Sequence, residues 1–138
     1  MAKTIQDCNR EDEYLCKEAN KFVGVYYDVL DRKREKITFL YANVSNSNLV
    51  WNGNPIDGYD NICKFMTSLP ASRHNIQSID AQRLPENVGG ELNNGIVLNI
   101  AGTVSSGDDV ERAFTQTIIL CIEDEKYKIR SDRFRYVE

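Results

Sequence analysis

The groups able to do acid–base chemistry are scattered along this chain of 138 residues. The single histidine, His74, and the carboxylates Asp80 and Asp132 could donate or accept protons, as could several of the seven tyrosines. Their spacing forms no recognisable pairing of a nucleophile with a base, or of two carboxylates. The sequence therefore predicts a protein that is not an enzyme and implies no cofactor.

The cysteines are equally dispersed. Cys8, Cys16, Cys63 and Cys121 include no C-x-x-C pair, and only His74 could join them as a nitrogen ligand. A zinc site is not expected on this spacing, and the thiols are predicted to be small buried or half-buried side chains. The first residues lack the apolar core of a secretory signal, so a nuclear or cytosolic compartment with reduced thiols is expected.

Size and composition indicate one soluble domain spanning residues 1–138. No apolar run approaches the roughly 20 residues that cross a bilayer, so no membrane partner is expected. The formal net charge is -4. Domains that coat nucleic acid are usually strongly basic, so direct nucleic-acid binding is not expected.

The apolar pattern places the helices first. Helical spacing predicts one long helix from about Glu11 to Arg34, with Asn9 as its N-cap, and shorter helices over Lys36–Tyr41 and Tyr59–Leu69. The basic cluster Arg32-Lys33-Arg34 falls at the end of the long helix, where cations are favoured, so a structural role is preferred to a phosphate-binding role.

The rest of the chain indicates strands. They are predicted over Leu49–Trp51, Ile76–Leu84, Ile96–Val104, Ala113–Ile122 and Tyr127–Val137, with a turn over Gly53, Pro55 and Gly58. The loops ENVGGELNNG, SSGDD and EDEK are expected to be hairpin connections. Helices followed by strands predict an α+β fold, with N-terminal helices packed on an antiparallel sheet.

The two phases of the strands predict a second buried face. Helices can cover one face of the sheet, yet both phases of the strands are apolar or small: Ile96, Leu98 and Ile100 alternate with Val97 and Ala101. A second face so poor in charge is not expected to meet water alone. The pattern therefore predicts a protein partner packed sheet against sheet.

Arg135 is the residue expected to carry specificity on that face. In Asp132-Arg133-Phe134-Arg135-Tyr136 the rings of Phe134 and Tyr136 should point to the core, which leaves Arg135 on the partner face. The planar guanidinium suits bidentate pairing with a carboxylate across an interface. A solvated arginine at a sheet edge is the alternative from the pattern alone.

The blocks LVWNGNPIDGYDNICKFMTSLP, FTQTIIL, SDRFRYV and FVGVYYDVLDRKR resemble the nuclear transport factor 2-like family, and in particular its export-related branch. This resemblance covers nearly the whole chain. It implies a cone-like fold of helices on a curved antiparallel sheet. It also implies a heterodimer with the similarly folded domain of a nuclear RNA export factor of the TAP type, as the small subunit of an mRNA export receptor.

The resemblance further implies contact with phenylalanine-glycine nucleoporins through the complex, and a location at the nucleus and nuclear pore with shuttling to the cytoplasm. Arg135 is the expected ion-pair residue, with Gln116, Asp80 and Gln82 as further partner-binding candidates. Gln116 shares its strand phase with Phe114, so the core side remains open for it.

Three alternatives stay open. One is a homodimeric transport factor that carries Ran-GDP; the exposed aromatic of the family's Ran carrier has no clear equivalent here, since the only tryptophan is Trp51. Another is a small-molecule isomerase or dehydratase, because enzymes share this fold. A third is a general interaction module for proteins of the same fold.

Overall fold

The computed structural model of the protein describes residues 5–84, 94–107 and 110–137, with the backbone alone for residues 5–12. The helices in this part of the chain are α1 (Ile5–Arg32), the 3-10 helix η1 (Arg34–Leu40) and α2 (Tyr59–Ser68). The strands are β1 (Asn48–Trp51), β2 (Asn54–Asp57), β3 (Ser72–Arg83), β4 (Ile96–Ser106), β5 (Glu111–Glu123) and β6 (Lys126–Tyr136).

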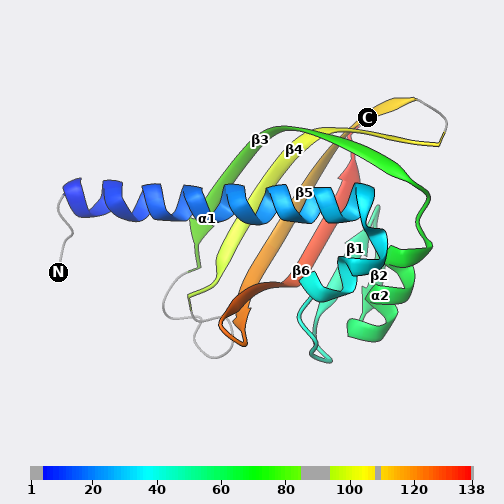
Figure 1. The fold of residues 1–138 in the computed structure, drawn as a ribbon, viewed down its shortest axis with the longest axis horizontal. Helices are drawn as coiled ribbons and strands as arrows, with labels where there is room; N and C mark the ends of the chain where they lie inside the picture. Colours follow the sequence, from blue (N-terminus) through cyan, green and yellow to red (C-terminus); the bar gives the residue numbers. More distant parts are fainter. Residues whose placement is uncertain (1–4, 85–93, 108–109, 138) are drawn as a thin grey trace.

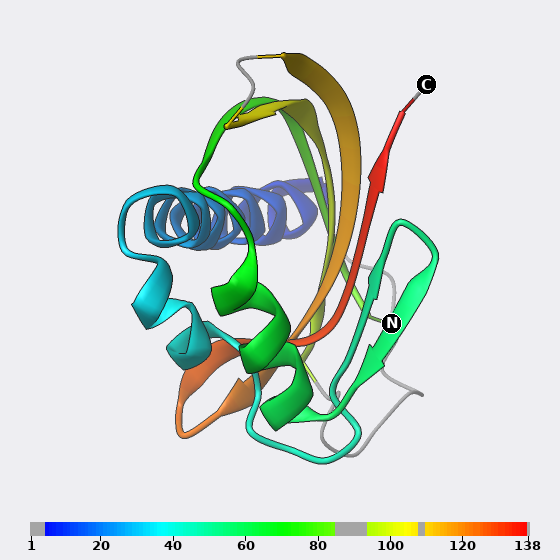
Figure 2. The ribbon, with the colours of Figure 1, turned by 90° about the vertical axis from the view of Figure 1, so that its right-hand side faces the viewer.

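The six strands form one curved sheet in the order β2-β1-β6-β5-β4-β3. Figure 1 shows α1 lying across the strands, and Figure 2 shows α1, η1 and α2 together on the concave side. The predicted α+β architecture is therefore confirmed. One pair differs from the expected antiparallel pattern, because β1 runs parallel to β6. The long connection between these two strands permits this direction, whereas a short hairpin would not.

The core lies between α1 and the concave face of the sheet. Apolar residues spaced three or four apart on α1 meet alternate residues of the strands. The fully or nearly fully buried side chains include Leu15, Ala19, Tyr26 and Leu30 of α1, Leu98 and Ile100 of β4, and Phe114 and Ile118 of β5.

The ends of α1 differ from the prediction. The helix begins at Ile5, so Asn9 lies inside it and is not the N-cap. It ends at Arg32, and Lys33 connects it to η1. The sequence from residue 5 to residue 12 is mostly polar, so periodicity indicated no helix before about Glu11.

The predicted turn after Trp51 is a β-hairpin. Asn52 and Gly53 have φ angles of 49° and 84°, and β2 then pairs with β1. An Asn-Gly pair suits this turn because both positions need a positive φ. Pro55 is tolerated because β2 is an edge strand. The loop ENVGGELNNG and the end of SSGDD lie largely outside the described residues.

Gly102 lets β3 bend closely over β4. The pairing of these strands shifts between Ile76 and Ser78, and Gly102 lies opposite Ile76. A Cβ atom at position 102 would lie 2.2 Å from the backbone oxygen of Asn75. This close approach is possible only without a side chain, and the bulge helps to curve the sheet.

Candidate protein-interaction site

The convex side of the sheet presents a face that no described helix covers. The strand register aligns its residues in rows from β3 to β6. We call this surface the outer face, and we define it by three rows of residues that run from β3 to β6. The first row is Gln82, Val97, Ile119 and Ser131, and the second is Asp80, Asn99, Thr117 and Arg133. The third row is Ser78, Ala101, Thr115 and Arg135. The second, weakly charged face of the strands that the sequence predicted is therefore one continuous surface in the structure.

Small and neutral side chains dominate the outer face. Its charges are Asp80 on β3 and two arginines on β6, Arg133 and Arg135. Between them lies a shallow depression of about 280 Å³, with small side chains such as Ala101 and Thr115 in its lining. A second sheet could approach such a surface closely, because few long or charged side chains would have to be desolvated.

Arg135 is exposed at one side of the outer face, opposite Thr115. Within the described part of the chain, no carboxylate lies within ion-pair distance of its guanidinium. Asp80 and Gln82 are exposed on β3, at the other side of the same face, and a weak contact of 3.5 Å joins Gln82 Nε2 to Asp80 Oδ2. The structure thus brings these three predicted residues onto one surface.

Gln116 does not lie on this surface, which corrects its place among the candidates. Its side chain is 2% exposed and points to the helices, in phase with Phe114 and Ile118. Gln116 Oε1 accepts a hydrogen bond from the Tyr27 hydroxyl, and Nε2 donates to Asp132 Oδ1 at 2.8 Å. Every polar atom of the amide is used inside the monomer, so we remove Gln116 from the partner-binding set.

Asp132 is the buried centre of this polar cluster. Its carboxylate is fully buried and accepts hydrogen bonds from Tyr41 Oη at 2.6 Å and Tyr26 Oη at 3.4 Å, as well as from Gln116. Burial raises the pKa of Asp132 to about 6, although the three hydrogen bonds oppose this rise. The alternation of β6 could have placed Asp132 in the core, two residues before Phe134, but nothing in the sequence identified its tyrosine partners.

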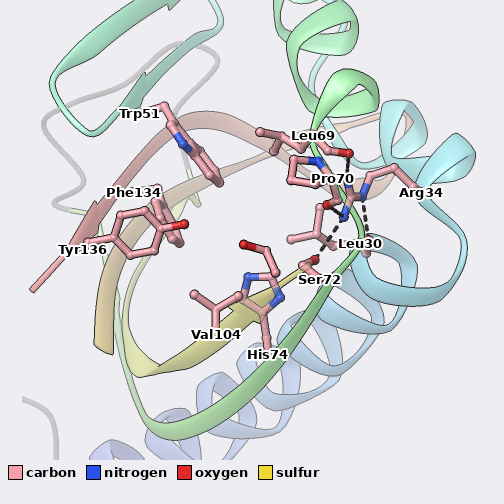
Figure 3. Close-up of a pocket in the computed structure, with 11 residues that line it drawn as sticks. Leu30, Arg34, Trp51, Leu69, Pro70, Ser72, His74, Val104, Phe134 and Tyr136 are labelled. Atoms are coloured by element: carbon pink, nitrogen blue, oxygen red, sulfur yellow. Dashed lines mark hydrogen bonds between the residues drawn. The ribbon is translucent and has the colours of Figure 1, made fainter. Parts of the chain in front are cut away.

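A small pocket lies on the concave side and is drawn in Figure 3. Its volume is about 80 Å³, and Leu30, Trp51, His74, Phe134 and Tyr136 are among its lining residues. Trp51 also stacks on Phe134 with ring centroids 4.0 Å apart and is partly buried against the core. Asp132 does not line this pocket. The volume is well below the roughly 300 Å³ at which sites for drug-sized ligands begin.

Arg34 holds the corner beside this pocket. Its guanidinium donates to the carbonyl oxygens of Leu30 at 2.6 Å, Leu69 at 2.7 Å and Pro70 at 3.0 Å. It also donates to Ser72 Oγ at 3.0 Å. These bonds join the ends of α1 and α2 to the start of β3, which confirms the predicted structural role for this member of the basic cluster.

Among the described residues, no group of three or more His, Cys, Asp and Glu side chains could hold a metal ion, and no helix is long and apolar enough to cross a membrane. Cys16 and Cys63 carry free thiols.

Comparison with known proteins gives consistent matches. The model of the nuclear transport factor 2 (NTF2) domain matches residues 18–136. An NTF2-related export protein of Caenorhabditis elegans is 62% identical over 99% of this chain and 98% of its own length. Nuclear transport factor 2 from Cryptosporidium parvum superposes with a TM-score of 0.78, at 25% identity over 89% of this chain and 94% of that chain.

A chain in the crystal structure of the C. albicans Mtr2-Mex67 M domain complex shares the fold, with a TM-score of 0.66. It is 16% identical, and the match covers 89% of this chain and 96% of that chain. The matches to both the domain model and the worm relative extend over most of the chain. The protein therefore belongs to the nuclear transport factor 2 family and, within it, to the NTF2-related export proteins.

Proposed function

We propose that the protein is the non-enzymatic small subunit of a heterodimeric mRNA nuclear export receptor. In this assembly the outer face packs against the similarly folded domain of a nuclear RNA export factor of the TAP type and stabilises it. The observation that carries the proposal is the outer face itself, a broad surface of small neutral side chains with Arg135 exposed at its side.

The chemistry of Arg135 defines what the partner must present. An arginine that becomes buried without a carboxylate would lose hydration and gain no compensating interaction. The partner is therefore expected to place an Asp or Glu opposite β6, where a bidentate pair can form. Arg133 lies one row away on the same strand and reinforces the positive potential at that side.

The opposite side of the outer face has the other polarity. Asp80 and Gln82 on β3 offer a carboxylate and an amide, three strands away from Arg135. A partner with an acidic group over β6 and a donor over β3 would match both ends at once. This separation of charge favours one docking orientation over its reverse.

The relatives support this assignment. The worm relative carries the name export protein, and a chain of this fold occurs in the solved Mtr2-Mex67 M domain complex. By the same proposal, the complex contacts phenylalanine-glycine nucleoporins mainly through the partner, and it shuttles between the nucleus, the nuclear pore and the cytoplasm.

Co-expression with the C-terminal region of a candidate export factor tests the proposal, with size-exclusion chromatography and light scattering as the readout. A one-to-one complex is the expected result. A stable homodimer that ignores the candidate and binds Ran-GDP would instead support the Ran-carrier alternative and overturn the proposal.

Arg135→Glu tests the docking residue within that experiment. The reversed charge would face the partner's carboxylate, which should weaken the complex by several kcal/mol, roughly a hundredfold or more. Lys64→Glu is the matched control, because it makes the same change of net charge at an exposed position of α2, on the helix side. Equal binding by wild type and Arg135→Glu would reject the role given to Arg135.

A further inference from the structure

The middle row of the outer face is polar from end to end, and its two inner positions are Asn99 on β4 and Thr117 on β5. The inner positions of the flanking rows are apolar or small: Val97, Ile119, Ala101 and Thr115. A side-chain amide therefore lies at the centre of the surface that the proposed function assigns to the partner. The centre of an interface is the part that loses most water, so a polar group there needs hydrogen bonds.

Thr117 fixes the orientation of this amide. Its hydroxyl donates to Asn99 Oδ1 at 3.0 Å, across the pairing of β4 with β5. The oxygen and the nitrogen of an amide lie on opposite sides of one carbon, so Nδ2 points away from Thr117. No residue that the structure describes accepts a hydrogen bond from Nδ2, and the side chain is exposed. Its N–H donors are therefore available to a partner.

Asp80 is the neighbour of Asn99 on the other side. The two residues are directly opposite each other in the pairing of β3 with β4, where Cβ atoms lie about 5 Å apart. The carboxylate of Asp80 is exposed and makes the weak contact of 3.5 Å with Gln82 Nε2. Its negative charge favours the orientation in which Nδ2, and not Oδ1, is on its side. A donor and an acceptor thus lie side by side on the outer face.

The shallow depression of the outer face brings a partner group to this pair. Asp80 and Asn99 both line it, with Ser78, Ala101 and Thr115 among the other lining residues. Its volume of about 280 Å³ exists because these last three side chains are small. Side chains of two facing sheets interdigitate, so one side chain of the partner can enter the depression. It would meet the amide of Asn99 and the carboxylate of Asp80 together.

The chemistry of the pair restricts the side chain that fits. A hydrocarbon would leave the N–H groups of Asn99 buried without acceptors, which is unfavourable. A carboxylate would be repelled by Asp80, and a cation would pair with Asp80 but offer no acceptor to Nδ2. A carboxamide matches both groups, because its oxygen accepts from Nδ2 while its N–H donates to the carboxylate.

We propose that Asn99 determines the specificity of the outer face, and that the partner places the side-chain amide of an Asn or Gln on Asn99 and Asp80. This inference rests on the proposed function and adds the contact at the centre to the ion pair of Arg135 at the side. A domain of the same fold that presents an aliphatic or acidic side chain at this point is rejected, because it leaves buried polar groups unpaired or brings like charges together.

The first test replaces the amide by a hydrocarbon of similar size. The affinity of the full chain for a full-length candidate export factor is measured by isothermal titration calorimetry. Asn99→Leu should bind about tenfold more weakly, the effect of leaving a buried hydrogen-bonding group without its partner. Asn20→Leu is the matched control at an exposed position of α1, on the helix side, and should bind like the wild type. Equal or tighter binding by Asn99→Leu would overturn the inference, because apolar packing alone would then explain the centre.

The second test exchanges the donor and the acceptor. Asn99→Asp places a second carboxylate beside Asp80 and should weaken binding. The double variant Asp80→Asn with Asn99→Asp again has one amide and one carboxylate, in exchanged positions. A partner carboxamide can turn by half a rotation to match them, so binding should recover. Tighter binding by Asn99→Asp would reveal a cation on the partner and overturn the inference, as would a double variant that binds no better than Asn99→Asp.

The outcomes separate this inference from the proposed function. If the wild type forms no complex, the proposed function fails and the inference fails with it. If the wild type binds and Arg135→Glu does not, but Asn99→Leu binds as well as the wild type, the inference alone is overturned. Asn99 is exposed, so its variants should fold, which their free energy of unfolding verifies. Should Asn99→Leu not fold, the exchange of Asp80 and Asn99 gives the same decision.

Discussion

The buried carboxyl of Asp132 predicts an unusual dependence of stability on pH. It lies among the hydroxyls of Tyr26 and Tyr41 and the amide of Gln116, all of which are neutral groups. Burial raises its pKa from the ordinary 3.8 to about 6 in the folded protein. The unfolded chain therefore releases this proton more readily than the folded chain does.

The sign and the size follow from this difference. Below about pH 4 the carboxyl is protonated in both states, and its contribution to stability is fully present. As the pH rises to about 6, ionisation favours the unfolded state, and above that the effect is constant. The rise of the Asp132 pKa from 3.8 to about 6 corresponds to roughly 3 kcal/mol of stability lost across this window.

Asp132→Asn isolates this contribution, because asparagine has nearly the same shape and cannot ionise. The free energy of unfolding of both proteins is measured in urea from about pH 4 to about pH 7.5. We expect the value for Asp132→Asn, relative to that of the wild type, to increase by roughly 3 kcal/mol as the pH rises over this range. The difference between the two proteins removes the titration of all other groups. A difference that stays constant with pH would refute the argument that Asp132 is buried as a poorly stabilised anion.

Four further substitutions test the backbone and the corner of the fold, each by its free energy of unfolding. Gly102→Ala should cost about 3 kcal/mol, because its Cβ would lie 2.2 Å from the backbone oxygen of Asn75. Gly24→Ala on α1 should instead stabilise the protein by about 1 kcal/mol, because a Cβ there would have no atom within 4 Å and alanine favours the helix. Equal effects of these two changes would contradict the close approach at β3. Arg34→Lys should cost roughly 1–2 kcal/mol, because one ammonium cannot serve the four acceptors that the guanidinium reaches; no loss would show that these bonds add nothing. Glu125→Gly should stabilise by about 1 kcal/mol, since residue 125 has a φ of 65°, and a loss of stability would contradict that turn geometry.

Local patterns in the sequence predicted most of the fold. Alternation located the strands within a few residues, because each strand buries one phase under the helices. The same alternation of side chains predicted Arg135 on the outer face and Phe134 in the core, and the structure confirms both positions. These assignments depend only on neighbours in the chain.

Long-range contacts account for what the sequence could not predict. Tyr26, Tyr41, Gln116 and Asp132 come from four separate parts of the chain, and no spacing along the sequence indicates that they meet. The parallel pairing of β1 with β6 could not be predicted for the same reason. These strands are some eighty positions apart, and nothing in their sequences indicates whether they run parallel or antiparallel. The sequence did not predict strand β2, because the strand has only four residues and contains Pro55. Proline and the glycines on either side of the strand are typical of a turn.

The position of β6 has a consequence for how the molecule is made. It is the last strand in the sequence, yet it lies between β1 and β5 in the sheet. A ribosome-bound chain that lacks residues 126–136 has two separate groups of strands and an unfinished core, so its apolar surfaces stay open to aggregation and chaperones. Arg135 arrives with the same strand. If the outer face binds a partner as proposed, completion of the fold and completion of the docking surface coincide.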